Sequence, residues 1–221
     1  MLTGCVQQVF FPQVNVATAR VLAAEGCDVI IPGDQGCCGA LSLHSGRASE
    51  AARFARRTIA AFERAAALSG RVRDFSEFLA ALPGGPHAAR HELPVTAAYH
   101  DACHLAHAQR IRQQPRDLLA AIPGLRLVEV GDAGTCCGSA GVYNLLQPEA
   151  AHELGERKAA AIRATGADLV VSGNPGCSLQ IAATLAGSGG ATPAVAHIAE
   201  VLDASIRGLP VPPAGRAVTA G

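Results

Sequence analysis

The chain has 221 residues, which is enough for one large domain or for two of about 100 residues that each bury a core. Its 18 basic and 18 acidic residues balance and are scattered, which excludes an electrostatic footprint for nucleic acid or an anionic membrane. Neither an apolar run of about 20 residues nor a charged-then-apolar leader is present, so we expect no transmembrane segment and a cytoplasmic protein.

Residues 1–82 are expected to form a first cysteine-rich repeat. Apolar spacing and turn signals predict, in chain order, a short strand at 1–3, a helix at 14–24, a strand at 28–31, a Cys37-Cys38-Gly39 loop, an amphipathic helix at about 47–66 and a helix-like segment at 72–79. In the long helix, Phe54, Ile59 and Phe62 are expected to face inward. Residues 83–94, rich in proline and glycine, are a predicted linker.

Residues 95–207 are expected to form a second, complete repeat. The same signals predict a strand at 95–99, a helix at 115–122, a strand at 125–130, a Cys136-Cys137 loop, a helix from Pro148 to Gly166, a strand at 168–172, and helices at 178–186 and 197–204. Prolines and glycines predict a disordered tail at 208–221.

A cysteine pattern occurs twice in the chain and is completed once. Cys5 precedes Cys37-Cys38-Gly39, and Cys103 precedes Cys136-Cys137-Gly138 at almost the same separation. Only the second copy continues to a further cysteine, Cys177. This near-equal spacing indicates a duplicated unit.

The first copy is shorter than the second. Segment 72–79 resembles segment 197–204, yet it begins much closer to Cys38 than His197 lies to Cys137. A stretch of chain is therefore missing from the first copy, and it corresponds to the third strand and the last cysteine.

Strands that alternate with helices predict an α/β fold of two pseudo-repeated βαβ-type halves with small parallel sheets, the first half shortened. The loops that leave the carboxyl ends of parallel strands share one edge, where ligands bind. We therefore expect the cysteines that follow the three strands of the second copy to converge; these are Cys103, Cys136, Cys137 and Cys177.

Four thiols in one place are a ligand set that iron–sulfur clusters and zinc prefer. Without a signal peptide, a disulfide framework is the weaker interpretation. We predict a metal site at these four cysteines, surrounded by Gly138, Gly141, Gly176 and His104, and a second, incomplete site at Cys5, Cys37 and Cys38. The alternative is that the cysteines are buried apolar residues, which is the interpretation we favour for Cys27.

Three histidines, His100, His104 and His107, lie near Cys103 in the sequence. A role as ligand or proton carrier competes with the more usual role of a solvated or capping histidine. Lys158, the single lysine, is interpreted as a coding bias without functional weight.

Five segments carry a resemblance to a known family: Gly4-Cys5-Val6-Gln7, Gly36-Cys37-Cys38-Gly39-Ala40, the run from His100 to Gln109, the run from Cys136 to Leu145, and Gly173-Asn174-Pro175-Gly176-Cys177. They resemble the iron–sulfur subunit of glycolate oxidase. More broadly, they resemble the duplicated cysteine-rich domain that lactate-utilisation proteins share with the B chain of heterodisulfide reductase.

The resemblance implies an electron-transfer subunit that passes electrons from a flavin subunit, which oxidises glycolate, to a quinone-type acceptor. It implies an iron–sulfur cluster of the 4Fe-4S type on Cys103, Cys136, Cys137 and Cys177. FAD is expected on a partner subunit, and the complex is expected to be cytoplasmic or peripheral at the inner face of the membrane. The heterodisulfide reductase version ends in Cys-x-x-Cys, whereas here Cys177 is followed by Gln180.

The chain departs from the family in two places. The family's subunit normally begins with a ferredoxin-like domain carrying two Cys-x-x-Cys-x-x-Cys-x-x-x-Cys-Pro runs, which are not found here, and it keeps a Gly-Cys-Gly segment in the first copy. We therefore expect an internally shortened C-terminal portion of the family, with the ferredoxin-like domain on a partner. The alternatives are a docking or structural-zinc module, or thiol–disulfide chemistry at Cys136-Cys137.

Overall fold

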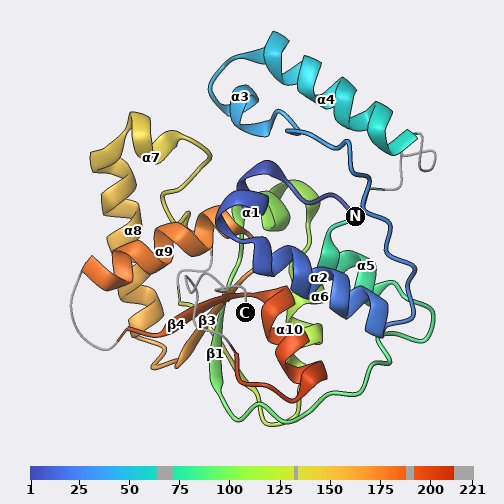
Figure 1. Cartoon of the computed structure of the whole chain (residues 1–221). Helices are drawn as coiled ribbons and strands as arrows, with labels where there is room; N and C mark the ends of the chain where they lie inside the picture. Colours follow the sequence, from blue (N-terminus) through green and yellow to red (C-terminus); the bar gives the residue numbers. More distant parts are fainter. Residues whose placement is uncertain (64–71, 132–133, 188–191, 212–221) are drawn as a thin grey trace.

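The computed structural model describes residues 1–63, 72–131, 134–187 and 192–211 (Figure 1). One parallel sheet has the order β2-β1-β3-β4 and consists of β1 (Thr96–His100), β2 (Arg126–Glu129), β3 (Leu169–Ser172) and β4 (Ala194–His197). The chain moves outward from β1 to β2 and then returns past β1 to β3. The strand order therefore reverses between β1 and β3, and open α/β sheets bind ligands at the carboxyl ends of the strands beside such a reversal.

Helices cover both faces of the sheet, which confirms the predicted α/β fold. Alternate strand residues point to opposite faces: Tyr99 and Val171 belong to one apolar core, and Ala98 and Val170 to the other. The first core is closed by α2 (Pro12–Ala24), α5 (Phe75–Ala80), α6 (Gln113–Ala120) and α10 (Ile198–Arg207), and the second by α8 (Pro148–Arg163) and α9 (Pro175–Gly187). Cys137 and Cys177 are members of the second core.

The elements predicted for residues 95–172 are present within a few residues of their predicted bounds. Three further elements of the second half were not predicted: η1 (His104–Gln109), which is π-helical, α7 (Tyr143–Leu146) and β4. The helix predicted at 178–186 begins earlier, at Pro175, so Cys177 lies in its first turn. Of the predicted tail, 208–211 follow α10 as irregular chain, and 212–221 lie outside the described residues.

The first half is helical, with α1 (Cys5–Phe10), α2, α3 (Ala40–His44), α4 (Ala48–Glu63) and α5. Within the described part of residues 1–82 there is no strand, so the strands predicted at 1–3 and 28–31 are wrong. The residues stay irregular and partly exposed because a two-stranded pairing without a third strand is only marginally stable.

The long first-half helix is confirmed as α4, but its predicted inner face needs a correction. Phe54 and Phe62 are half-buried, whereas Ile59 is 43% exposed; Ala51, Thr58 and Ala61 form the buried face instead. Residues 64–66, the predicted end of this helix, lie outside the described residues. Cys27, predicted as a core residue, is only half-buried.

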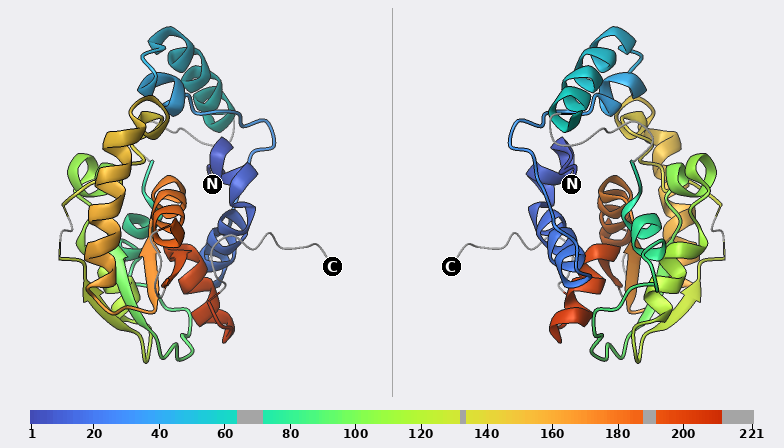
Figure 2. Two further views of the ribbon diagram at one scale, coloured as in Figure 1. Left: turned by 90° about the vertical axis from the view of Figure 1, so that its left-hand side faces the viewer. Right: turned by 90° about the vertical axis from the view of Figure 1, so that its right-hand side faces the viewer.

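The two halves pack crosswise. The last helix of the first half, α5, packs against α6 of the second half, and α10 of the second half packs against α2 of the first (Figures 1 and 2). Both α5 and α10 begin with a capping box, made by Asp74 with Glu77 and by His197 with Glu200. The matching caps show why 72–79 resembles 197–204, and the exchange of helices joins the halves into one core.

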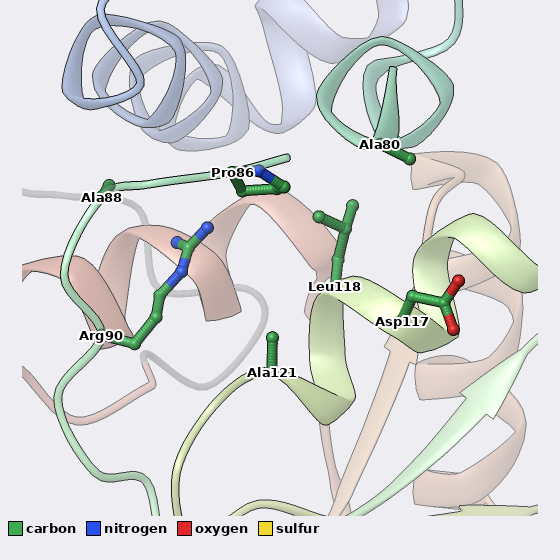
Figure 3. Close-up of a pocket in the computed structure, with 7 residues that line it drawn as sticks. All are labelled: Ala80, Pro86, Ala88, Arg90, Asp117, Leu118 and Ala121. Carbon is green, nitrogen blue, oxygen red and sulfur yellow. The ribbon is translucent and has the colours of Figure 1, made fainter. Parts of the chain in front are cut away.

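A cavity of about 300 Å³ lies where residues 83–94, the predicted linker, meet α5 and α6 (Figure 3). Its walls include Pro86 and Arg90 from the linker and Leu118 from α6, and none of its lining residues is a cysteine. It is therefore separate from the predicted metal site. No helix in the described ranges is long and apolar enough to span a bilayer.

Acid should weaken the fold through His197, which is 8% exposed and caps α10. Its Nδ1 accepts the Ala199 N–H at 3.2 Å, which requires the neutral ring. Burial lowers the pKa of His197 from 6.5 to about 4, so its stabilisation is complete above pH 6.5 and is lost as the pH falls toward 4. Below that pH the loss is on the order of 3 kcal/mol.

The His197→Asn variant isolates this effect, since asparagine keeps an N-cap acceptor but does not titrate. We expect its unfolding free energy, measured by urea denaturation between pH 7 and 4, to fall less steeply than that of the wild type. His100 titrates in the same window, so part of the slope should remain. Identical pH slopes for both proteins would contradict the prediction.

Candidate metal site

The four cysteines of the second copy lie at the carboxyl ends of β1, β2 and β3, beside the strand reversal between β1 and β3. Cys103 follows β1, Cys136 and Cys137 lie in the loop after β2, and Cys177 lies in the first turn of α9, after β3. The four thiols interact in three successive pairs: Cys103 with Cys136, Cys136 with Cys137, and Cys137 with Cys177. The expected convergence is therefore present, although the thiols come from three segments that are far apart in the sequence.

The environment of Cys103, Cys136 and Cys137 disfavours their uncompensated thiolates. Burial and contact with Cys136 raise the pKa of Cys103, and contact with Cys137 and burial raise that of Cys136. Cys136 lowers the pKa of Cys137, but contact with Cys177 and burial outweigh it and bring the value to about 12. Without a cation, the negative charges of neighbouring thiolates repel one another, so the thiols stay protonated. A metal ion between them favours the thiolate form, and the residues therefore fit a metal centre.

The Cys-Cys-Gly turn has the same geometry in both copies. Gly138 has φ +90°, and its N–H donates to Cys136 Sγ at 3.3 Å; Gly39 has φ +86°, and its N–H donates to Cys37 Sγ at 3.4 Å. Each glycine lies against the following long helix, where an added Cβ would meet the backbone of Ala151 or Ala51. The duplication inferred from spacing therefore extends to the backbone of the turns.

Alanine at position 138 should distort this turn. A Cβ on Gly138 would lie 2.3 Å from the backbone oxygen of Ala151, and the positive φ itself disfavours a side chain. We expect Gly138→Ala to lower the unfolding free energy, measured in urea, by about 2 kcal/mol or more. Gly134→Ala is the matched control, because a Cβ there meets nothing within 4 Å. Equal stability of the two variants would contradict the steric argument.

The other predicted surrounding residues lie at the borders of the site. Gly141 has φ +68°, and a Cβ there would come within 3.0 Å of His44 in α3, so this loop packs against the first half. Gly176 lies in the first turn of α9, where a Cβ would come 3.3 Å from Ser139 Oγ. His104 begins η1 and is exposed.

His100, rather than His104, is the histidine that enters the site. It is the last residue of β1 and is 1% exposed. One of its ring nitrogens, Cys137 Sγ and Cys177 Sγ all lie within 4.8 Å of one another. Burial, followed by the charge of Lys158, lowers the pKa of His100 to about 4. The signal in the sequence was the strand alternation, which places His100 on the same face as the buried Ala98.

Lys158 is the second residue near the site that the sequence pattern did not predict. It is 0% exposed on the inner face of α8; its charge adds to the effect of burial in lowering the pKa of His100, and it opposes the burial and Cys136 contact that raise the pKa of Cys103. A fully buried lysine is rare without a compensating group. Its position close to His100 and Cys103 gives it a place beside the site that a coding bias does not explain.

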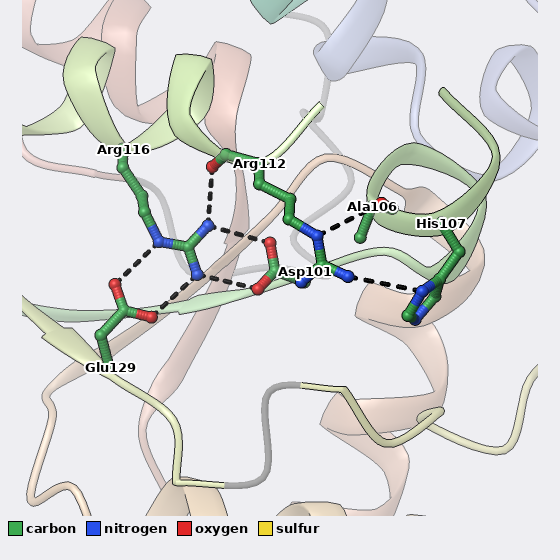
Figure 4. A network of polar contacts seen from close by, with 6 residues as sticks. All are labelled: Asp101, Ala106, His107, Arg112, Arg116 and Glu129. Atoms are coloured by element: carbon green, nitrogen blue, oxygen red, sulfur yellow. Dashed lines mark hydrogen bonds and ion pairs between the residues drawn. The ribbon is translucent and has the colours of Figure 1, made fainter. Parts of the chain in front are cut away.

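A salt-bridge network holds the segment that carries Cys103 (Figure 4). Arg116 of α6 binds both carboxylate oxygens of Asp101 at 2.9 and 2.8 Å, and both oxygens of Glu129 in β2 at 2.8 Å. Its guanidinium also lies 5.2 Å from the centre of the Tyr99 ring. Because Asp101 closely precedes Cys103 in the chain, these paired hydrogen bonds fix the start of η1 relative to β2.

The first-copy cysteines also come together. Cys5 Sγ lies 3.6 Å from Cys37 Sγ, and burial followed by contact with Cys37 raises the pKa of Cys5. The charge of Cys38 acts on the same thiol. Each of the three is half-buried, and no third strand in the described first half brings a fourth cysteine to them.

A family model described as "Cysteine-rich domain" (CCG) matches residues 1–69 and 97–182. The chain therefore belongs to the CCG cysteine-rich domain family and carries two repeats of the domain.

Relatives within the curated proteins agree with this assignment. The chain is 35% identical over 212 residues to a "Probable glycolate oxidase iron-sulfur subunit" of Bacillus subtilis (strain 168), covering 81% of this chain and 48% of the relative. It is 33% identical to the B chain of a fumarate reductase (CoM/CoB) of Methanothermobacter marburgensis, covering 91% and 45%. It is 28% identical to "Lactate utilization protein A" of Shouchella clausii, covering 92% and 97%.

The resemblance to the glycolate oxidase iron–sulfur subunit is confirmed by these comparisons. The chain spans about half the length of the first two relatives and nearly the whole of the third.

Proposed function

We propose that this chain is the iron–sulfur electron-transfer subunit of a glycolate-oxidase-like complex. The observation that carries the proposal is the meeting of Cys103, Cys136, Cys137 and Cys177 at the switch point of the sheet, where their thiols contact one another. A bound cluster, which we propose to be of the 4Fe-4S type, would supply reversible one-electron transfer. Names of relatives that contain "iron-sulfur subunit" support the same cofactor.

The protein's own contribution is to hold and tune the cluster. The four cysteines would be its ligands. The Gly138 N–H, which already donates to Cys136 Sγ, and the buried Lys158 would both stabilise negative charge on the sulfurs. Hydrogen bonds and local charge of this kind set the reduction potential of a cluster. We propose that Cys5, Cys37 and Cys38 are the remains of a second such site.

The partners in this proposal are FAD-containing subunits as electron donor, a ferredoxin-like iron–sulfur domain, and a quinone-type acceptor, in a cytoplasmic complex that associates with the inner face of the membrane. Exposed apolar side chains support docking near the cysteines. Phe10 of α1 is 64% exposed, Leu43 of α3 is 59% exposed and Leu145 of α7 is 76% exposed. Each of these helices begins at or soon after a cysteine motif, so a donor bound to one of these side chains would lie close to the cysteines of that motif.

Anaerobic purification followed by iron and acid-labile sulfide analysis tests the proposal. We expect about four iron and four sulfide per chain on the second-copy site, with visible charge-transfer absorption that bleaches on reduction. A protein that contains stoichiometric zinc without sulfide, or that remains metal-free and colourless after reconstitution with iron and sulfide, would contradict it.

A further inference from the structure

The imidazole of His100 is buried without a hydrogen-bond partner among the described residues. The side chain is 1% exposed, and within the described residues neither Nδ1 nor Nε2 has a hydrogen-bond partner. A buried polar group without a partner costs free energy, so such a group indicates a partner outside the polypeptide. Because both nitrogens of the ring lack a partner, the indication of an external partner is stronger than it would be for a single unpaired atom.

The position of the ring indicates what that partner is. The nearest ligand atoms to it include Cys137 Sγ and Cys177 Sγ, and all three atoms lie within 4.8 Å of one another. They come from the end of β1, from the loop after β2 and from the first turn of α9. Metal–sulfur and metal–nitrogen bonds are about 2.0–2.3 Å long, so atoms at this separation can share one metal atom.

The register of the sheet explains why the ring points there. His100 pairs with Ser172 at the carboxyl ends of β1 and β3, directly at the switch point. The strand alternation directs Ala98 and His100 to the face covered by α8 and α9, and Cys177 belongs to α9. His104 and His107 are exposed on η1, which leaves His100 as the histidine that the fold directs toward the thiols.

We propose that His100 is a metal ligand of this site, through one ring nitrogen, so that the centre is held by imidazole as well as by thiolates. The inference rests on the proposed metal-binding function and specifies its ligand set. Imidazole is neutral where a thiolate is negative, and a neutral ligand favours the reduced, more negative state of the metal. Replacement of thiolates by histidine raises the reduction potential in other iron–sulfur centres. The site should therefore accept electrons more readily than an all-cysteine site of the same cluster type.

Spectroscopy of the wild-type chain gives the most direct test. The chain is grown with 15N-labelled histidine, reconstituted anaerobically with iron and sulfide, reduced, and measured by pulsed paramagnetic resonance. We expect a strongly coupled histidine nitrogen that changes from the 14N to the 15N pattern on labelling. Cobalt(II) titration of the metal-free protein is the second probe, because its visible bands distinguish pure sulfur from mixed sulfur and nitrogen coordination.

Three variants complete the test. His100→Cys should keep the metal, lose the nitrogen coupling and shift the reduction potential downward, whereas His100→Phe should weaken cobalt(II) binding about tenfold or more. His107→Gln, which changes an exposed histidine of η1, is the matched control and should change neither the nitrogen coupling nor the reduction potential. Circular dichroism and urea midpoints of the metal-free variants separate a ligand effect from misfolding.

The outcomes separate the inference from the function on which it rests. An iron–sulfur centre without histidine nitrogen coupling, and with the same potential in His100→Cys, would overturn ligation by His100 and leave the electron-transfer function intact. A wild-type chain that binds neither iron nor cobalt(II) would overturn the function itself.

Discussion

Serine in place of Cys137 is expected to remove nearly all iron and sulfide from the purified chain. Cys137 is 1% exposed and lies between Cys136 and Cys177 in the line of interacting thiols, and it is also in the group with His100. A serine hydroxyl is a poor ligand for iron–sulfur clusters compared with a thiolate, so the site loses its central member. Iron and sulfide content, measured per chain after identical reconstitution, should fall to background.

The duplicated turn provides a matched control for this substitution. Cys38 occupies the position of Cys137 in the first copy, between Cys37 and a glycine whose turn has nearly the same φ. Cys38→Ser makes the same chemical change at the incomplete site, and we expect iron and sulfide to stay near the wild-type level. If Cys38→Ser empties the protein and Cys137→Ser does not, the cluster belongs to the first copy and the proposed assignment is wrong.

The second-copy site was predictable because parallel strands obey a strong positional rule. Each cysteine follows a strand, and the carboxyl ends of parallel strands lie at one edge, so cysteines as distant in the sequence as Cys103 and Cys177 could be placed together. The glycine turns were also visible in the sequence, since Cys-Cys-Gly recurs with nearly the same spacing. What the sequence could not supply was the order of the strands, which places the site between β1 and β3.

The charged and polar interior of the site was not predictable from local pattern. His100 ends an apolar strand and Lys158 lies within an ordinary amphipathic helix, so neither has a local signal of function. Their burial follows from the packing of α8 and α9 on the sheet, which is a tertiary property. Alternation along β1 placed His100 on a face, but only the fold shows that Cys137 and Cys177 share that face.

The first half was predicted less well because a short strand is stable only when it pairs with others, and residues 1–63 and 72–82 contain no strand. The strand signals at 1–3 and 28–31 are local preferences of the residues for strand, and without neighbouring strands in the described first half the chain there is irregular. The helices of the first half form because they pack on helices of the second half: α2 lies against α10, and α5 against α6. Interactions between the first half and the chain that follows it should therefore contribute strongly to the stability of the whole molecule.

Glu25 is the clearest such interaction. It lies at the end of α2, and its side chain is 0% exposed; Oε2 accepts the N–H groups of His87 and Ala88 at 2.6 and 2.9 Å, and Oε1 accepts Arg90 Nη2 at 2.8 Å. One carboxylate thus anchors the linker to the first half. Removing its charge leaves the guanidinium of Arg90, whose side chain is only 9% exposed, without its anion.

We expect Glu25→Gln to lower the unfolding free energy of the metal-free protein by about 3–5 kcal/mol, because breaking a buried ion pair leaves an uncompensated charge. Urea denaturation followed by circular dichroism measures the change.

Glu50→Gln is the control: Glu50 faces Arg47 at 3.2 Å on the surface of α4, where loss of an ion pair costs at most about 1 kcal/mol. The double variant Glu25→Gln/Arg90→Met should be less destabilised than the sum of its two single variants, since it removes the stranded charge as well. A loss below about 1 kcal/mol in Glu25→Gln would show that the linker is held mainly by apolar packing.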